Sequence, residues 1–260
     1  AASDVYKRQD VKDGENPLAM ITDGGTKTTW NNRIGGKAAI DITPIKGLKI
    51  SGVIAPTYNF DKIKSFVKQV PYTYANDPNT VKGYMAAFST TKLTEYRNDY
   101  YDVTTQFFAN YNKTFGKHDL SVMVGYEDYY AFWENLNASR DQYELTGYPY
   151  LDIGPETYRD NSGNAEEYAY RSLFGRVTYN YDNRYLLQAN FRRDGSSRFA
   201  PESRWANFPS FSAGWILSEE QFMKNLNWDW LSYLKLRGSW GTLGNERITD
   251  INNNDKQNYY

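Results

Sequence analysis

The chain has 260 residues, a formal net charge of −1 and no cysteine. This near-balance of charge excludes a strongly basic surface for nucleic acid, and the absence of cysteine excludes disulfides, thiol catalysis and cysteine metal sites. The one histidine, His118, argues against a histidine-based metal or catalytic site. Aromatic residues make up 17% of the chain, with 24 Tyr, and this composition favours extended structure over helices.

No stretch holds the roughly 18 consecutive apolar residues that a membrane-spanning helix needs. The mean hydropathy of −0.76 still permits a membrane β-barrel, because only alternate residues of each strand face lipid.

The N-terminal part is expected to contain one hairpin between two polar stretches. Residues Asp10–Asn32 are rich in turn-forming dipeptides and are predicted to be a loop. Arg33–Thr43 and Leu48–Phe60 alternate apolar and polar residues across a short turn at Pro44, which predicts two antiparallel strands. The polar segment Asp61–Glu95 is predicted to be a long loop.

A second, longer hairpin follows. Tyr96–Phe115 and Asp119–Asn137 alternate in the same way on either side of a turn at Gly116. Both predicted strands are longer than the roughly 9–11 residues that cross a bilayer. Another long loop is predicted over Ala138–Glu167.

The clearest alternation runs from Tyr168 to Phe199 and predicts a third hairpin. Its apolar positions include Val177, Leu187 and Phe191, while amides, hydroxyls and Arg occupy the positions between them. Asp182-Asn183 supplies the turn, because both residue types tolerate a left-handed backbone. One face of this hairpin is therefore apolar and the other is polar.

The C-terminal part predicts a loop, a strand, a short helix and a last strand. The loop covers Asp194–Asn207 and the strand covers Phe208–Leu217. Ser218 is expected to cap the helix, with Gln221 closing a capping box. Tyr233–Leu243 alternates again and predicts the last strand.

Short turns and long loops alternate along the chain, as in an up-and-down membrane barrel with brief periplasmic turns and longer outer loops. Aromatic residues also gather near the predicted strand ends, where interfacial girdles lie. One group is expected at one rim and a second group at the other: Tyr129, Tyr130, Phe132 and Trp133; Tyr181, Tyr185, Trp228 and Trp230. The fold class predicted is all-β, an antiparallel up-and-down meander that forms part of a large transmembrane β-barrel.

The run Tyr170–Met223 resembles the barrel of the SusC/RagA-like family of TonB-linked outer-membrane transporters. Three shorter stretches resemble the same family: Asn16–Ala19 with Gly24-Gly25, Gly147–Leu151 and Leu234–Gly244. The resemblance implies that residues 1–260 are an internal piece of the barrel domain, with about eight of the roughly 22 strands expected for such transporters. The plug and the N-terminal domains of the family would lie outside this piece.

The resemblance also implies a function. Such proteins import oligosaccharides or peptides across the bacterial outer membrane, with energy from the TonB complex and with a SusD-like lipoprotein as a lid. We therefore expect an integral outer-membrane protein among lipid and lipopolysaccharide, without a cofactor, a metal or an enzymatic activity.

Candidate contacts to substrate or lid lie among loop aromatics and strand-end arginines. Tyrosines in the long loops could stack on sugar rings or on the lid, although loop aromatics more often pack on their own loop. These tyrosines are Tyr72, Tyr74, Tyr84, Tyr148, Tyr150 and Tyr158. Arg193 and Arg198 could form an anion-binding or carbohydrate-binding rim, or could simply hold the shape of a turn.

Two alternatives compete with the transporter. The first is a non-catalytic carbohydrate-binding β-sandwich, which would bury Val177, Leu187, Phe191 and Trp215 beneath a second sheet. The second is a β-propeller or barrel enzyme of glycan breakdown, which needs converging carboxylates; neighbouring pairs such as Glu219-Glu220 diverge instead. A barrel piece would expose its apolar face, and alone without detergent we expect it to aggregate.

Overall fold

The computed structural model describes residues 16–74, 76–226 and 230–246. The chain divides into two compact units, and each is described by itself. Unit 1 comprises Ala1–Ile34, Tyr58–Tyr100 and Trp133–Ala165, and unit 2 comprises Gly35–Thr57, Tyr101–Phe132 and Glu166–Tyr260.

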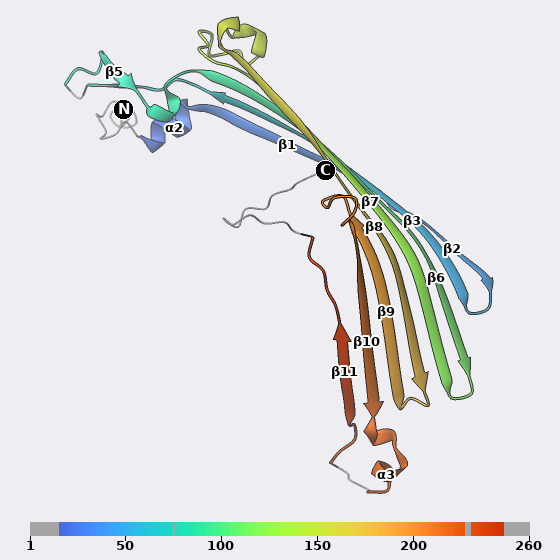
Figure 1. The fold of residues 1–260 in the computed structure, drawn as a ribbon. Coiled ribbons are helices and arrows are strands. Elements are labelled where there is room, and N and C mark those ends of the chain that lie inside the picture. Colours follow the sequence, from blue (N-terminus) through green and yellow to red (C-terminus); the bar gives the residue numbers. More distant parts are fainter. Residues whose placement is uncertain (1–15, 75, 227–229, 247–260) are drawn as a thin grey trace. The chain divides into compact units, whose positions relative to one another are not determined.

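The dominant element is a nine-stranded sheet in which each strand from β2 onward pairs with the next strand of the sheet along the chain, while β1 also pairs with β3 (Figure 1). Its order is β1-β3-β6-β7-β8-β9-β10-β11, and β2 also pairs with β3. The strands are β1 (Gly25–Gly35), β2 (Ala38–Ile45), β3 (Leu48–Val67), β6 (Lys92–Phe115), β7 (His118–Arg140), β8 (Arg159–Tyr181), β9 (Tyr185–Ser196), β10 (Trp205–Ile216) and β11 (Lys235–Gly241). The predicted all-β antiparallel meander is confirmed, with nine strands in place of about eight.

Unit 1 contains a helix that the sequence pattern did not predict. Helix α2 (Pro17–Asp23) begins after Asn16, whose side chain accepts hydrogen bonds from the backbone N–H groups of Leu18 and Ala19. The predicted loop Asp10–Asn32 is therefore wrong over its described part, because α2 and most of β1 occupy it. An Asn cap followed by Pro at the first helical position is a helix-start signal that was present in the sequence.

Apolar side chains of unit 1 form two small cores. In the first, Ala19, Val70 and Met85 are buried, and Met20, Tyr72 and Phe88 pack against them. In the second, Phe66, Leu93 and Tyr143 are buried, with Leu151 packed against them. Short elements surround these cores: β4 (Pro71–Thr73), β5 (Val81–Tyr84) and the 3₁₀ turns η2 (Ala86–Phe88), η3 (Leu151–Ile153) and η4 (Glu156–Tyr158).

In unit 2 the hairpin β8–β9 forms as predicted. Thr178 faces Gln188 and Val177 faces Ala189 in its register. Asp182 and Asn183 form the turn with φ of 53° and 54°, in the left-handed region that Asp and Asn tolerate best after glycine.

Strand boundaries differ from the predictions mainly where the sequence is polar. The predicted loop Ala138–Glu167 is wrong at both ends, because β7 extends to Arg140 and β8 begins at Arg159. The predicted loops Asp61–Glu95 and Asp194–Asn207 are likewise shortened by the ends of their neighbouring strands. Backbone hydrogen bonds continue the pairing there, and they need no apolar alternation.

The predicted strand Arg33–Thr43 is interrupted after Gly35, where β1 ends, and β2 begins at Ala38. The predicted capping box is wrong. The 3₁₀ turn η5 (Leu217–Glu219) precedes helix α3 (Gln221–Lys224), whose N-cap is Glu220 without a side-chain hydrogen bond. No helix in the described part of the chain combines the length and apolar character of a membrane span.

Candidate functional site

The register of β8–β11 divides the side chains of unit 2 between two faces. On one face Val177 lies opposite Ala189, and Ala189 lies opposite Phe211. Apolar side chains of this face remain exposed: Val177 by 42%, Leu187 by 53%, Phe191 by 47% and Trp215 by 36%. A β-sandwich would bury these four side chains, so the structure contradicts that alternative and agrees with a barrel wall.

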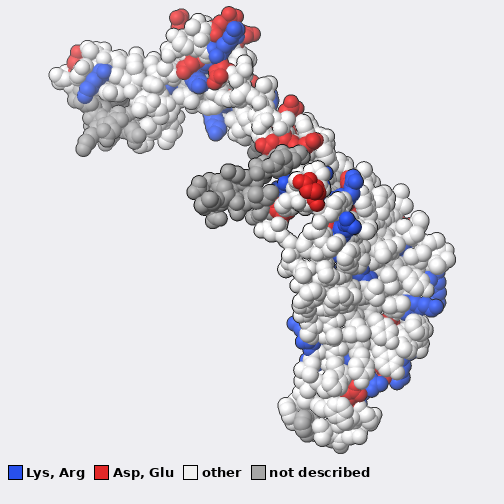
Figure 2. All heavy atoms as spheres, viewed as in Figure 1, with Lys and Arg blue, Asp and Glu red and all other residues white. Residues whose placement is uncertain are grey.

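Figure 2 shows charged side chains of unit 2 near the β2–β3 and β6–β7 turns, with residues other than Lys, Arg, Asp and Glu covering most of the displayed surface between them. The exposed apolar side chains of β8–β10 are typical of a side that meets lipid or a partner rather than water.

An aromatic row crosses five strands of unit 2 at the end that carries the short turns. The ring centroids of Phe115 and His118 lie 4.9 Å apart, and those of His118 and Tyr181 also lie 4.9 Å apart. Tyr181 stacks on Tyr185 at 6.2 Å, and Tyr185 stacks on Trp215 at 6.4 Å. This aromatic row contains Tyr181 and Tyr185, as the predicted girdle does. It also contains Phe115, His118 and Trp215, which the prediction missed.

The other predicted girdle is divided between the faces. Tyr101 packs near Tyr130 and Phe132, with ring centroids 5.8 Å apart in both pairs. Tyr129 instead stacks on Tyr170 at 5.0 Å, as expected because adjacent strand residues point to opposite faces. Of the three remaining rim residues, Trp133 is partly buried, Trp230 is exposed, and Trp228 lies outside the described residues.

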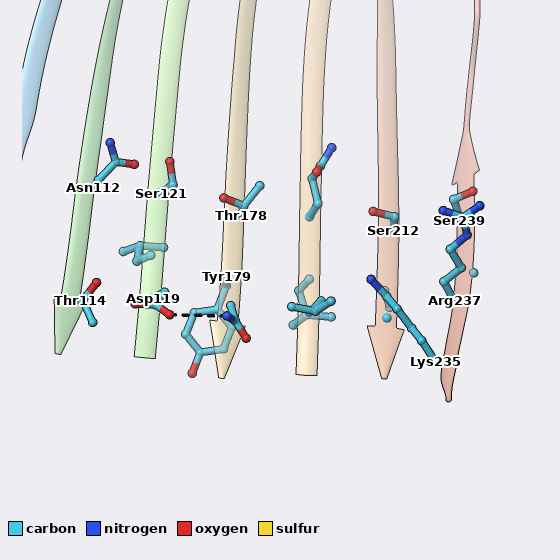
Figure 3. Close-up of a pocket in the computed structure, with 18 of the residues that line it drawn as sticks. Asn112, Thr114, Asp119, Ser121, Thr178, Tyr179, Ser212, Lys235, Arg237 and Ser239 are labelled. Carbon is cyan, nitrogen blue, oxygen red and sulfur yellow. Dashed lines mark hydrogen bonds between the residues drawn. The ribbon is translucent and has the colours of Figure 1, made fainter. Parts of the chain in front are cut away.

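The opposite, polar face carries a row of uncharged hydrogen-bonding side chains, one from each of six strands (Figure 3). Thr178 faces Gln188, Gln188 faces Ser212 and Ser212 faces Ser239. Asn112 of β6 and Ser121 of β7 continue this polar row in Figure 3. The members are Asn112, Ser121, Thr178, Gln188, Ser212 and Ser239.

The polar row lines a hollow of about 810 Å³, hereafter the turn-end hollow. Lys235 and Arg237 of β11 border it on one side and Asp119 of β7 borders it on the other. Asn180 donates from Nδ2 to Asp119 Oδ2 over 3.5 Å. The Asn180 Oδ1 atom is buried without a hydrogen-bond partner among the described residues.

Farther along the same face, a charged network is centred on Arg192. Its guanidinium donates to Asp194 at 2.7 and 2.8 Å and to Ser172 Oγ at 2.9 Å. Glu127 lies 3.8 Å from Arg192 and accepts a 2.5 Å hydrogen bond from Gln106 Nε2. Because these groups satisfy one another, we interpret the network as a brace between strands β6–β9.

A second hollow, of about 380 Å³, lies beside this network. Nearby, the Tyr168 hydroxyl lies 2.7 and 2.8 Å from the carboxylate oxygens of Glu246, and Arg198 stacks over the Tyr168 ring at 4.7 Å. The Arg198 Nε atom is buried without a hydrogen-bond partner in the described part of the chain.

The turn end of unit 2 is rich in ion pairs. Lys117 Nζ lies 2.8 Å from Asp182, and Arg184 also pairs with Asp182. Hydrogen bonds from Lys117 and Arg184 lower the pKa of Asp182. Hydrogen bonds from Tyr185 and then Trp215 lower the pKa of Glu220, and nearby Arg184 adds to the effect.

The predicted contact residues do not form one cluster. All six loop tyrosines belong to unit 1, whereas Arg193 and Arg198 belong to unit 2. Tyr72 packs against the first core, in line with the expectation that loop aromatics more often pack within their own region than on a ligand. Three exposed tyrosines have no stacked ring or cation beside them in the described part of the chain and stay candidates for contacts: Tyr84, Tyr148 and Tyr158.

Cations cover the rings of the other candidates. Lys82 lies over Tyr74 at 5.6 Å and Lys64 over Tyr150 at 4.6 Å. The Arg193 guanidinium lies over the Trp205 ring at 5.3 Å.

The polar row was missed because each of its members looks like an ordinary polar strand residue, and only the strand register brings them together. Among the described residues, no group of three or more His, Cys, Asp or Glu is placed to hold a metal ion.

A family model described as TonB dependent receptor-like, beta-barrel, matches residues 10–257. The chain is 38% identical over 159 residues to TonB-dependent receptor P39 of Formosa agariphila, covering 59% of this chain and 15% of that protein. It is 29% identical over 240 residues to TonB-dependent receptor SusC of Bacteroides thetaiotaomicron, covering 91% of this chain and 22% of that protein. The chain thus spans about a fifth or less of these relatives.

Solved structures share the fold. The RagAB peptide transporter aligns with a TM-score of 0.76 and 24% identity, over 89% of this chain and 24% of that chain. The RagAB peptide importer in its open-open state aligns with the same score of 0.76 at 23% identity, over 93% of this chain and 26% of that chain.

Proposed function

Because this chain belongs to the SusC/RagA-like TonB-dependent receptors, as part of their β-barrel, we propose that it forms part of the wall of a nutrient importer in the bacterial outer membrane. Residues 1–260 would make up one partial barrel domain. In this proposal the chain contributes a surface for lipid and a lining for the transport path, and it performs no chemistry.

One observation supports this proposal most strongly, namely the opposite character of the two faces of β8–β11. Leu187 is 53% exposed, while its neighbour in the chain, Gln188, belongs to the polar row. In water this arrangement leaves a large apolar area unprotected. In a membrane it is stable, because lipid covers the apolar face and water fills the polar side.

The ends of the strands support an orientation. The turns at Lys117 and Asp182 are short, and the aromatic row from Phe115 to Trp215 lies beside them. Outer-membrane barrels place short turns on the periplasmic side and aromatic girdles at the interfaces. We therefore place the turn end in the periplasmic half of the wall.

The substrate and the partners are also part of the proposal. The solved structures similar to this chain are described as a peptide importer or transporter, and the resemblance of the sequence implies oligosaccharides or peptides. A SusD-like lipoprotein lid would contact the outer loops, where Tyr84, Tyr148 and Tyr158 are exposed. The TonB complex would act through a plug, and lipopolysaccharide would surround the outer part of the wall.

The test uses a complete receptor that carries this chain. Cell fractionation should recover it with the outer membrane, and uptake of labelled oligosaccharides or peptides should stop when TonB is deleted. Recovery in the periplasm, or uptake that is independent of TonB, would contradict the proposal.

A further inference from the structure

A row of residues crosses β8, β9 and β10 at the end of the apolar face that is farther from the short turns. In the register Arg171 faces Gly195, and Gly195 faces Trp205. Each of the three lies ten positions along its strand from a member of the aromatic row, and an even spacing keeps both rows on one face. Ten strand residues extend roughly 33 Å, which a tilt of about 40° reduces to a height of about 25 Å, the height of the apolar band of an outer-membrane barrel. This second row therefore lies at the other interface of the proposed wall.

A glycine allows the side chains of this row to meet. A Cβ atom at Gly195 would lie 2.8 Å from Cδ2 and Cε3 of Trp205, so the indole ring lies directly over the glycine. The Arg193 guanidinium lies over the same ring. Arg193 and Arg171 are diagonal neighbours on adjacent strands, with Cβ atoms roughly 7–8 Å apart. Their long side chains can therefore hold one anion between them.

The cations at this place outnumber the acids. Arg171 Nε donates to Asp128 Oδ1 over 2.6 Å, and its terminal nitrogens have no hydrogen bond within the described part of the chain. Arg193 forms no ion pair with any residue that the structure describes. Both arginines are exposed, and both have their neighbouring strands in place, because β7 flanks β8 and β10 flanks β9. One positive charge is thus left without a counter-ion on the face that the proposed function gives to lipid.

Open polar groups lie beside the two arginines. Asn207 faces Arg193 in the register and is exposed, and its side-chain amide has no hydrogen bond to another described residue. Asp128 Oδ2 likewise lacks a described hydrogen-bond donor. An amide and a carboxylate oxygen can bind sugar hydroxyl groups. Toward the aromatic row the same face continues with exposed Leu173 and Phe191, which suit acyl chains.

We propose that Arg171 and Arg193, braced by Trp205, bind the phosphate group of a phosphorylated glycolipid in the outer leaflet, with its sugar beside Asp128 and Asn207. This inference rests on the proposed function, which supplies the membrane and its orientation, and it identifies one lipid partner of the wall. Guanidinium groups bind phosphate in a bidentate way. An ordinary phospholipid would bring a phosphate without the sugar hydroxyls that the neighbouring polar groups can bind.

The main test compares two lipids on the purified complete receptor, monophosphoryl lipid A and the same acylated disaccharide without its phosphate. Native mass spectrometry of a titration in detergent should show about tenfold tighter binding of the phosphorylated lipid. The double variant Arg171→Gln/Arg193→Gln should weaken binding of this lipid about tenfold or more, because charge-assisted hydrogen bonds are the strong ones. Binding of the phosphate-free lipid should change less than about twofold.

Two further variants separate the site from general effects of charge. Arg176→Gln removes a cation from the opposite face of β8, where Arg176 donates to Asn190, and it should leave both affinities unchanged. Arg171→Lys/Arg193→Lys keeps both charges but loses the bidentate geometry, so its affinity for the phosphorylated lipid should lie between those of the unmodified receptor and the glutamine variant. Thermal unfolding in detergent checks that every variant is folded.

Equal binding of monophosphoryl lipid A by the unmodified receptor and by the folded Arg171/Arg193 glutamine variant would overturn the inference. Equally tight binding of phosphatidylglycerol, which has a phosphate but no sugar, would overturn it too. In either case recovery of the receptor with the outer membrane and TonB-dependent uptake would leave the proposed function standing. Recovery of the unmodified receptor outside the outer membrane would count against that function instead.

Discussion

Unit 1 buries its apolar side chains in two small cores, whereas unit 2 leaves side chains of the same kind on its surface. Leu93 and Phe66 of unit 1 are 0% and 3% exposed, while Leu187 and Phe191 of unit 2 are 53% and 47% exposed. Hydrophobic burial from water can stabilise unit 1. In unit 2, backbone hydrogen bonds between strands and, in the proposed function, contact of the apolar face with lipid have to stabilise the fold instead. The comparison teaches that one chain can carry a region suited to water and a region suited to lipid.

The largest expected effect concerns the core of unit 1. Leu93→Ala should destabilise this region by about 2–5 kcal/mol, because it leaves a cavity between Phe66 and Tyr143. Hydrogen exchange of the segment 141–153 should quicken accordingly. Leu187→Ala is the matched control in unit 2, and in detergent it should change stability by only about 0.5 kcal/mol. Equal effects of the two substitutions would break the comparison.

A charge placed on the apolar face should have the next largest effect. Phe191→Arg should destabilise the complete receptor in a bilayer by about 2–4 kcal/mol, because this exposed apolar position lies six residues from the aromatic row at Tyr185 and therefore near the membrane centre. Gln188→Arg, three residues away on the same strand, should be tolerated because Gln188 belongs to the polar row. Unfolding by urea in lipid vesicles measures both, and the comparison fails if Gln188→Arg is the more harmful substitution.

A smaller effect is expected in the charged network. Arg192→Gln should cost about 1–3 kcal/mol, since Asp194 and Glu127 then lose their charged partner. Arg193→Gln is a suitable control, because Arg193 lies on the other face over Trp205. Thermal unfolding should separate the two variants, with Arg192→Gln the lower in melting temperature.

The smallest effect concerns pH. The folded state lowers the pKa of both Asp182 and Glu220, so each stabilises the turn end above its unfolded pKa. This stabilisation should fade as the pH falls through the acidic range toward the lowered folded values, where the carboxylates become protonated. Hydrogen exchange near residues 182–184, followed from neutral to acidic pH, should quicken as this stabilisation is lost. The variant Glu220→Gln should show a smaller change of the exchange rate with pH, because it lacks one of the two carboxylates. A protection that is independent of pH would contradict this assignment.

Much of unit 2 was predictable because its strands alternate strictly. Val177 and Leu187 mark the apolar face from sequence alone, and Asp182-Asn183 marks the turn that the structure shows. Unit 1 was less predictable. Strand β1 reads GTKTTWNNRIG, so no period of two marks it, and its pairing depends on backbone hydrogen bonds.

The turn-end hollow could not have been found by inspecting single strands. Thr178, Ser212 and Ser239 lie far apart in the chain, and only the cross-strand register places them in one row. The predicted rim residues Arg193 and Arg198 were identified from one short stretch, and they stack on Trp205 and Tyr168 respectively. Distance along a strand is readable from sequence, whereas distance across a sheet is not.

The central claim is that adjacent residues of β9 meet different solvents, and the lack of cysteine in this chain makes it directly measurable. Single cysteines at positions 186 to 191 of a complete receptor, with any other cysteines replaced, would carry a spin label in lipid vesicles. Accessibility to oxygen should be high at Leu187, Ala189 and Phe191, and accessibility to a water-soluble nickel complex should be high at Leu186, Gln188 and Asn190. An absence of this alternation, or its inverse, would contradict the account.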